Sequence, residues 1–98
     1  MAETKITVVA RIKAKPGMEN EVKDFLAELL APTRAEKGCL QYDLHESQEE
    51  KGIFLFYENW ASRDALDRHL QSQHITAAFD RAPALLAEPV RMTLWNKV

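Results

Sequence analysis

The chain has 98 residues, a length typical of one domain, so we expect a single domain over residues 1–98. It carries 13 basic and 15 acidic residues and a net charge of −2, which argues against nucleic acid or an anionic membrane as partner. Cys39 is the only cysteine, which excludes an intrachain disulfide. Residues 1–5 contain no apolar targeting segment, and no run is long enough to span a membrane. These features predict a cytoplasmic protein.

Alternating apolar and polar residues predict a first strand over residues 6–14. A helical stripe then predicts a helix from about residue 18 to about residue 36. Pro32 is expected to kink this helix or end it early, and Gly38 fits a C-terminal stop. The stripe consists of Val22, Phe25, Leu26, Leu29 and Leu30.

A second strand is predicted over residues 39–45, with Leu40, Tyr42 and Leu44 on one face. The polar residues 47–52 end in glycine and predict a hairpin loop. Residues 53–60 form the most apolar segment of the chain and predict the third strand.

Ser62 is a favourable N-cap for a second helical region. Residues 71–73 separate two apolar stripes in it, and Pro83 is expected to end or bend the second piece. A fourth strand is predicted over residues 90–98. The stripes are Ala65, Leu66, His69 and Leu70, followed by Ile75, Ala78, Phe79 and Ala82.

The order β-α-β-β-α-β predicts an α+β, ferredoxin-like domain, in which four antiparallel strands carry both helices on one face. The third and fourth strands place large apolar residues on both of their faces. Since two helices cover only one face, a second copy of the sheet is the simplest cover for the other, which predicts a homodimer. Aromatic residues half exposed on an open face are the alternative.

Three segments resemble the antibiotic biosynthesis monooxygenase family, and quinol monooxygenase-like members most closely. They are residues 36–42 (EKGCLQY), 56–62 (FYENWAS) and 65–74 (ALDRHLQSQH). The opening strand with Pro16 and Gly17 also fits. The resemblance implies a dimeric α+β barrel and an oxygenase without metal or flavin, because the reduced aromatic substrate itself supplies electrons to oxygen.

We expect no cofactor. There is no glycine-rich nucleotide loop between a strand and a helix. The resemblance also includes heme-degrading members, which use an asparagine on the first strand, a tryptophan, and a histidine ten residues later as iron ligand. At the corresponding positions this sequence has residues 8–10, His69 and Phe79, so all three heme-type residues are missing.

His69 and His74 are candidate catalytic residues. They are five residues apart, roughly 140° around an ideal helix, so they converge only if the chain breaks near Ser72. No cysteine or third clustered ligand accompanies them, so we expect no metal site. Proton transfer is the functional interpretation, and both also lie on motif histidines in the resemblance. The structural alternative is a core histidine at position 69 and a helix-end histidine at position 74.

Glu58 and Trp60 share a strand face with apolar residues. Because a buried carboxylate is costly unless paired, Glu58 is expected to orient an imidazole or to pair with Arg11 or Arg91. Trp60 is a candidate pocket wall, and a core tryptophan is the alternative.

A substrate pocket is expected between the sheet and the second helical region, with Trp60 and Phe79 as walls. Tyr42 and Tyr57 are further candidate lining residues, and Arg11 is a candidate for holding an anionic substrate oxygen. Ordinary core packing, and for Arg11 a solvated strand position, are the alternatives.

These features predict a cofactor-independent monooxygenase that oxidises a small reduced aromatic, quinol-like molecule with O2. Two alternatives stay open. The same barrel is suited to a proton-transfer isomerase that uses the histidines, or to a non-catalytic small-ligand-binding or stress-associated dimer.

Overall fold

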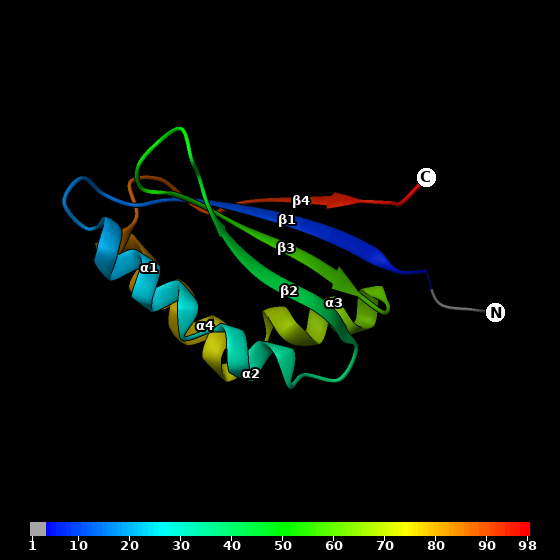
Figure 1. Cartoon of the computed structure of the whole chain (residues 1–98). Coiled ribbons are helices and arrows are strands. Elements are labelled where there is room, and N and C mark those ends of the chain that lie inside the picture. The colour runs from blue at the N-terminus through cyan, green and yellow to red at the C-terminus, as the bar shows by residue number, and fades with distance from the viewer. Residues whose placement is uncertain (1–3) are drawn as a thin grey trace.

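The computed structural model describes residues 4–98; residues 1–3, part of the segment in which we expect no targeting signal, lie outside this range. The four strands form one antiparallel sheet in the order β2-β3-β1-β4, and the helices lie on one side of it (Figure 1). The α+β, ferredoxin-like prediction is confirmed. The elements are β1 (Ile6–Lys13), α1 (Glu19–Ala27), α2 (Leu30–Arg34), β2 (Cys39–Glu46), β3 (Ile53–Trp60), α3 (Arg63–Leu70), α4 (Gln73–Leu85) and β4 (Arg91–Trp95).

The first helical region is two helices, so the prediction of one helix over residues 18–36 is wrong. The break lies at Glu28 and Leu29, before Pro32. In a continuous helix Pro32 would leave the carbonyl of Glu28 without a donor. The break instead places Pro32 in the first turn of α2, where no intrahelical N–H bond is required.

The second helical region also divides in two. Ser62 caps α3 as predicted, because its Oγ accepts a hydrogen bond from the backbone N–H of Ala65 at 3.1 Å. Gln71 and Ser72 then separate α3 from α4. Pro83 does not end α4, which continues to Leu85. The break between the helices is what allows His69 and His74 to face the same point.

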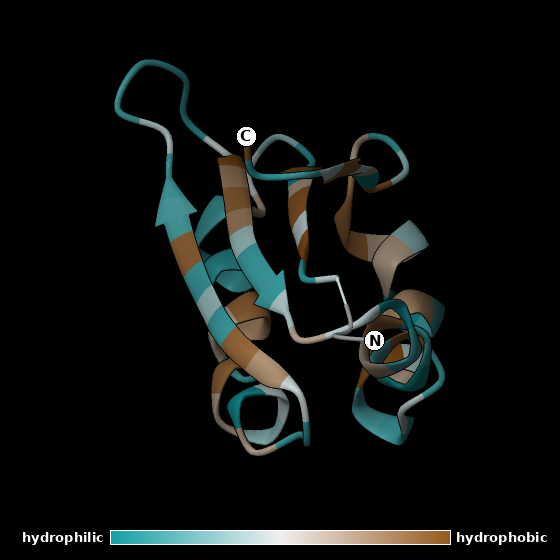
Figure 2. Ribbon diagram, turned by 90° about the vertical axis from the view of Figure 1, so that its right-hand side faces the viewer, coloured by the Kyte–Doolittle hydropathy of each residue, from teal (hydrophilic) through white to brown (hydrophobic). Residues whose placement is uncertain are grey.

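The helix-covered face of the sheet is the core. In β3 the buried residues alternate with more exposed ones, and Figure 2 shows apolar and polar bands alternating along the strands. One expected alternation fails in β2. A register shift between Cys39 and Gln41 leaves Leu40 exposed, whereas Tyr42 is buried. Leu40 therefore does not share the face of Tyr42, because a bulge inserts one extra residue and reverses the alternation.

The opposite face of the sheet is uncovered in the single chain. It carries Tyr57, which is 37% exposed, and Trp95, which is 57% exposed. β4 is shorter than the predicted residues 90–98 and is exposed along its length. No helix among the described residues has the length and apolarity needed to cross a membrane.

Candidate functional site

A cavity of about 70 Å³ lies between the sheet and the helices. A cavity needs roughly 10–15 Å³ of this kind of volume to hold one water molecule. This cavity therefore has room for a small planar molecule. Its lining is mostly aliphatic and aromatic. Among the described residues that line it, only Tyr42, Glu58 and His69 carry ionisable groups. A larger hollow at Phe79 and Val90 adjoins it. Chemistry in this cavity therefore depends on few polar groups.

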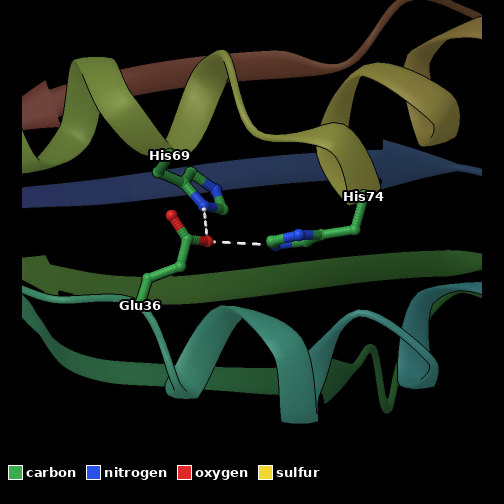
Figure 3. A group of neighbouring side chains, drawn as sticks. All are labelled: Glu36, His69 and His74. Atoms are coloured by element: carbon green, nitrogen blue, oxygen red, sulfur yellow. Dashed lines mark hydrogen bonds and ion pairs between the residues drawn. The ribbon is translucent and has the colours of Figure 1, made fainter.

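His69 projects from α3 into the core and is 3% exposed. Its Nδ1 lies 2.7 Å from Oε2 of Glu36, a residue in the connection between α2 and β2 (Figure 3). None of the described residues forms a hydrogen bond with its Nε2. Because no buried side-chain nitrogen or oxygen of the described residues lacks a partner, Nε2 is accessible, and His69 lines the cavity. One ring nitrogen is therefore held and the other is open.

His74 reaches the same carboxylate from the start of α4. Its Nε2 lies 3.0 Å from Oε2 of Glu36 and 3.1 Å from Oγ1 of Thr33. Its side chain is 24% exposed, and it does not line the cavity. Both histidines thus meet at one carboxylate oxygen (Figure 3), but only His69 faces the cavity.

Gly38 places the Glu36 segment against α3. Its φ is +89°, and a Cβ built on it would lie 2.6 Å from Cβ of Ala65. Its carbonyl also accepts a hydrogen bond from the N–H of Ala61 at 2.8 Å. A residue without a side chain is therefore required for this close approach.

The contact with Glu36 selects a tautomer of His69. An ionised carboxylate only accepts hydrogen bonds, so Nδ1 of His69 carries the hydrogen and Nε2 keeps its lone pair. Burial lowers the pKa of His69, and the contact with Glu36 opposes this shift. The neutral ring therefore presents a proton acceptor to the cavity.

Glu58 is the second carboxyl group of the site. It is 3% exposed and lines the cavity. Burial raises its pKa to about 7, against the hydrogen bond donated by Trp60. That bond joins Nε1 of Trp60 to Oε1 of Glu58 at 2.9 Å. The expectation that Glu58 orients an imidazole or pairs with Arg11 or Arg91 is wrong, because its partner is the indole and Glu36 holds the imidazole.

The aromatic candidates separate into two groups. Tyr42 and Phe79 line the cavity, and burial raises the pKa of Tyr42. Trp60 is fully buried and does not line the cavity. Its ring centroid lies 4.5 Å from that of His69. Trp60 therefore packs against His69 and donates a hydrogen bond to Glu58 without reaching the cavity. The expectation that it forms a pocket wall is wrong.

Two other candidates lie away from the cavity. Arg11 and Leu55 are paired in the β1–β3 register, on the face that also carries Tyr57, and neither Arg11 nor Tyr57 lines the cavity. Arg11 instead forms an ion pair with Glu88 at 2.7 Å. The predicted contacts of Arg11 and Tyr57 with substrate are therefore not supported within one chain.

Glu36 is the residue that sequence reasoning missed. The argument that His69 and His74 lack a third clustered ligand is wrong, because their ring nitrogens and Oε2 of Glu36 lie within 4.8 Å of one another. The signal for Glu36 was its place two residues before Gly38, in a segment already noted for its family resemblance. Thr33 and Ser72, which also approach His74, carried no such signal.

The fold and the site define a small α+β domain with an oriented imidazole facing an apolar cavity. Residues 5–81 match the model of the antibiotic biosynthesis monooxygenase family, and the chain belongs to this family. Similar curated proteins include "Putative monooxygenase Rv0793" of Mycobacterium tuberculosis, which is 37% identical over 91% of this chain and 87% of its own. Another is an uncharacterised Synechocystis protein, which is 34% identical over 97% of this chain. This chain spans only 65% of the length of that relative.

Solved structures show the same fold. The structure of PA3566 from Pseudomonas aeruginosa has a TM-score of 0.91 and 36% identity, covering 100% of this chain and 98% of its own. The structure of Rv0793 from M. tuberculosis also has a TM-score of 0.91, with 34% identity over 97% of this chain and 96% of its own. Family and relatives together support a monooxygenase-type function.

Proposed function

We propose that this protein is a cofactor-independent monooxygenase that oxidises a small, quinol-like aromatic molecule with O2. The observation that carries the proposal is His69, whose Nδ1 lies 2.7 Å from Oε2 of Glu36 and whose ring lines an apolar cavity. The family and the monooxygenase relatives support the same class of reaction.

In this mechanism Nε2 of His69 accepts a phenolic proton from the substrate. The resulting phenolate is electron-rich and transfers electrons to O2, so the substrate is the reductant. For a hydroquinone, one oxygen atom enters the ring to give a hydroxyquinone and the other leaves as water. The substrate gives up four electrons, which balances the reduction of O2. Glu36 holds the tautomer, and Tyr42 and Phe79 contact the substrate ring.

The test measures oxygen uptake by chelator-treated protein with reduced naphthoquinones and benzoquinones, above the autoxidation blank. Uptake with one atom of ¹⁸O from ¹⁸O2 in the product supports the proposal. Stoichiometric hydrogen peroxide without ¹⁸O incorporation would instead identify an oxidase. Binding of quinols without any uptake would favour the non-catalytic, ligand-binding alternative.

A proton-transfer isomerase is the second candidate. Its support is that Glu58, with a pKa of about 7, and His69 both face the cavity, so that one group is able to remove a proton while the other returns one. Substrate conversion without oxygen uptake, with deuterium from solvent appearing in the product, would favour this candidate.

We also propose that the protein is a cytoplasmic homodimer in which two sheets pack through their uncovered faces. Tyr57 and Trp95 lie exposed on this face, and burying them would cover an apolar surface of the kind that monomers seldom expose. Light scattering at micromolar concentration is expected to give the dimer mass. Tyr57→Glu should give a monomer, whereas the helix-side control Glu28→Lys should not. A folded wild-type monomer would defeat this proposal.

A further inference from the structure

Three potential metal ligands converge beside the cavity. Nδ1 of His69, Nε2 of His74 and Oε2 of Glu36 all lie within 4.8 Å of one another (Figure 3). Two imidazoles and one carboxylate form a ligand set that binds borderline divalent ions such as Zn²⁺, with water at the remaining position. The three residues come from three separate segments, so only the folded chain brings them together.

We propose that Glu36, His69 and His74 bind a divalent transition-metal ion of the Zn²⁺ type, and that the bound ion converts His69 from a proton acceptor to a proton donor toward the cavity. The effect on activity rests on the proposed function, whereas metal binding does not.

The three ligand atoms, now within 4.8 Å of one another, must move to bind one ion. With bonds of about 2.0–2.1 Å, tetrahedral ligand atoms lie roughly 3.4 Å apart. Oε2 of Glu36 is now 2.7 Å from the nitrogen of His69 and 3.0 Å from that of His74, so both contacts must lengthen by several tenths of an ångström. The side chains of Glu36 and His74 are 17% and 24% exposed. They are therefore able to rotate, and the ion has a path from solvent.

Two hydroxyl groups complete the surroundings. Oγ1 of Thr33 lies 3.1 Å and Oγ of Ser72 3.5 Å from Nε2 of His74. Both can form hydrogen bonds with a water molecule bound to the ion. Neither Glu36 nor His74 lines the cavity, so the ion would lie behind the ring of His69, without contacting a molecule in the cavity.

Coordination changes what His69 presents to the cavity. The ion takes the lone pair of Nδ1, so the single hydrogen of the neutral ring must lie on Nε2. Nε2 then donates a hydrogen bond and no longer accepts a proton. The ion therefore acts as an inhibitor of the proposed reaction. The tautomer of His69 distinguishes the metal-free protein from the metal-bound protein.

The binding test titrates the chelator-treated full-length protein with Zn²⁺ in competition with a chromophoric chelator. We expect one ion per chain. Glu36→Gln and His74→Ala should each weaken binding by at least roughly 100-fold, the upper end of what loss of a supporting outer partner costs. His45→Ala is the matched control, since His45 is exposed on β2, and it should bind as the wild type does. If His74→Ala does not fold by circular dichroism, His74→Gln replaces it.

The second readout is the tautomer of His69, from ¹⁵N NMR of its ring. We expect hydrogen on Nδ1 in the metal-free protein and on Nε2 after addition of one equivalent of Zn²⁺. Binding that survives in Glu36→Gln and His74→Ala, no binding up to millimolar Zn²⁺, or an unchanged tautomer would each overturn the inference. If no quinol supports oxygen uptake, the proposed function fails, but these two measurements still decide the metal site.

Discussion

Glu36, which contacts His69, and Glu58, which lines the same cavity as His69, are two carboxyl groups of the site with different environments. Glu58 is 3% exposed, and among the described residues its one side-chain hydrogen-bond partner is the indole of Trp60. The Glu36 side chain is 17% exposed and contacts two imidazoles. Glu36 is therefore suited to hold a ring in one orientation. Glu58, whose pKa burial raises to about 7, is suited to carry and exchange a proton. The same residue type has two roles because its surroundings differ.

The largest expected effect comes from removing the imidazole of His69, which contacts Glu36 and lines the cavity. His69→Gln retains an amide that is able to donate to Glu36 but removes the proton acceptor. Oxygen uptake with the best quinol should fall by about 10²–10⁴-fold, the usual contribution of a general base. Urea unfolding of the same variant checks that the fold is intact. Full activity in a folded His69→Gln protein would refute the role of His69.

The raised pKa of Glu58 should make the free energy of unfolding depend on pH. This pKa is raised from 4.5 to about 7 in the folded protein, so between these values the folded protein binds more protons than the unfolded chain. The free energy of unfolding must therefore decrease as pH rises through this range. The decrease is up to about 3 kcal/mol, since one pKa unit corresponds to about 1.4 kcal/mol.

The comparison of wild type with Glu58→Gln isolates this effect. His69, whose pKa burial lowers, acts in the opposite direction in both proteins and cancels in the difference. Urea unfolding at pH 5 and pH 8, at one protein concentration, should show that the difference in stability between wild type and Glu58→Gln changes with pH. A constant difference would mean that Glu58 is ionised throughout.

Glu36→Gln tests the other carboxyl group. The amide is able to donate as well as accept, so the tautomer of His69 is no longer fixed. We expect kcat to fall by about 10–100-fold, as for other partners that orient a functional histidine. KM should change little because Glu36 does not line the cavity. A variant that raises KM with unchanged kcat would contradict the positioning role.

The sequence was sufficient to place Glu58 on the face of Trp60 but not to find its partner, and it did not reveal Glu36; the reason is physical. Alternation along a strand is a local property, so the face shared by Phe56, Glu58 and Trp60 follows from their spacing. The positions of Glu36 and His69 relative to each other depend on two helix breaks and on a close approach at Gly38, none of which has a period. The same limit explains the error at Leu40, where a bulge reversed the alternation.

The smallest effect tests how the Glu36 segment is held. Gly38→Ala introduces a Cβ 2.6 Å from that of Ala65, at a φ of +89°. Gly17 has a similar φ of +86°, but a Cβ there would meet nothing within 4 Å. Gly17→Ala therefore measures the backbone cost alone. Gly38→Ala should lower the free energy of unfolding by at least about 1 kcal/mol more, the lower end of the cost of overpacking.

A double variant separates the steric contact from other effects of Gly38→Ala. Ala65→Gly removes the atom with which the new Cβ collides, although glycine itself weakens α3 by up to about 1 kcal/mol. The two substitutions together should cost less than the sum of their separate costs, because residues in contact do not act additively. Strictly additive costs, measured by urea unfolding, would show that α3 does not constrain Gly38. The position of Glu36 would then have to be explained by the contacts of its own side chain with His69 and His74.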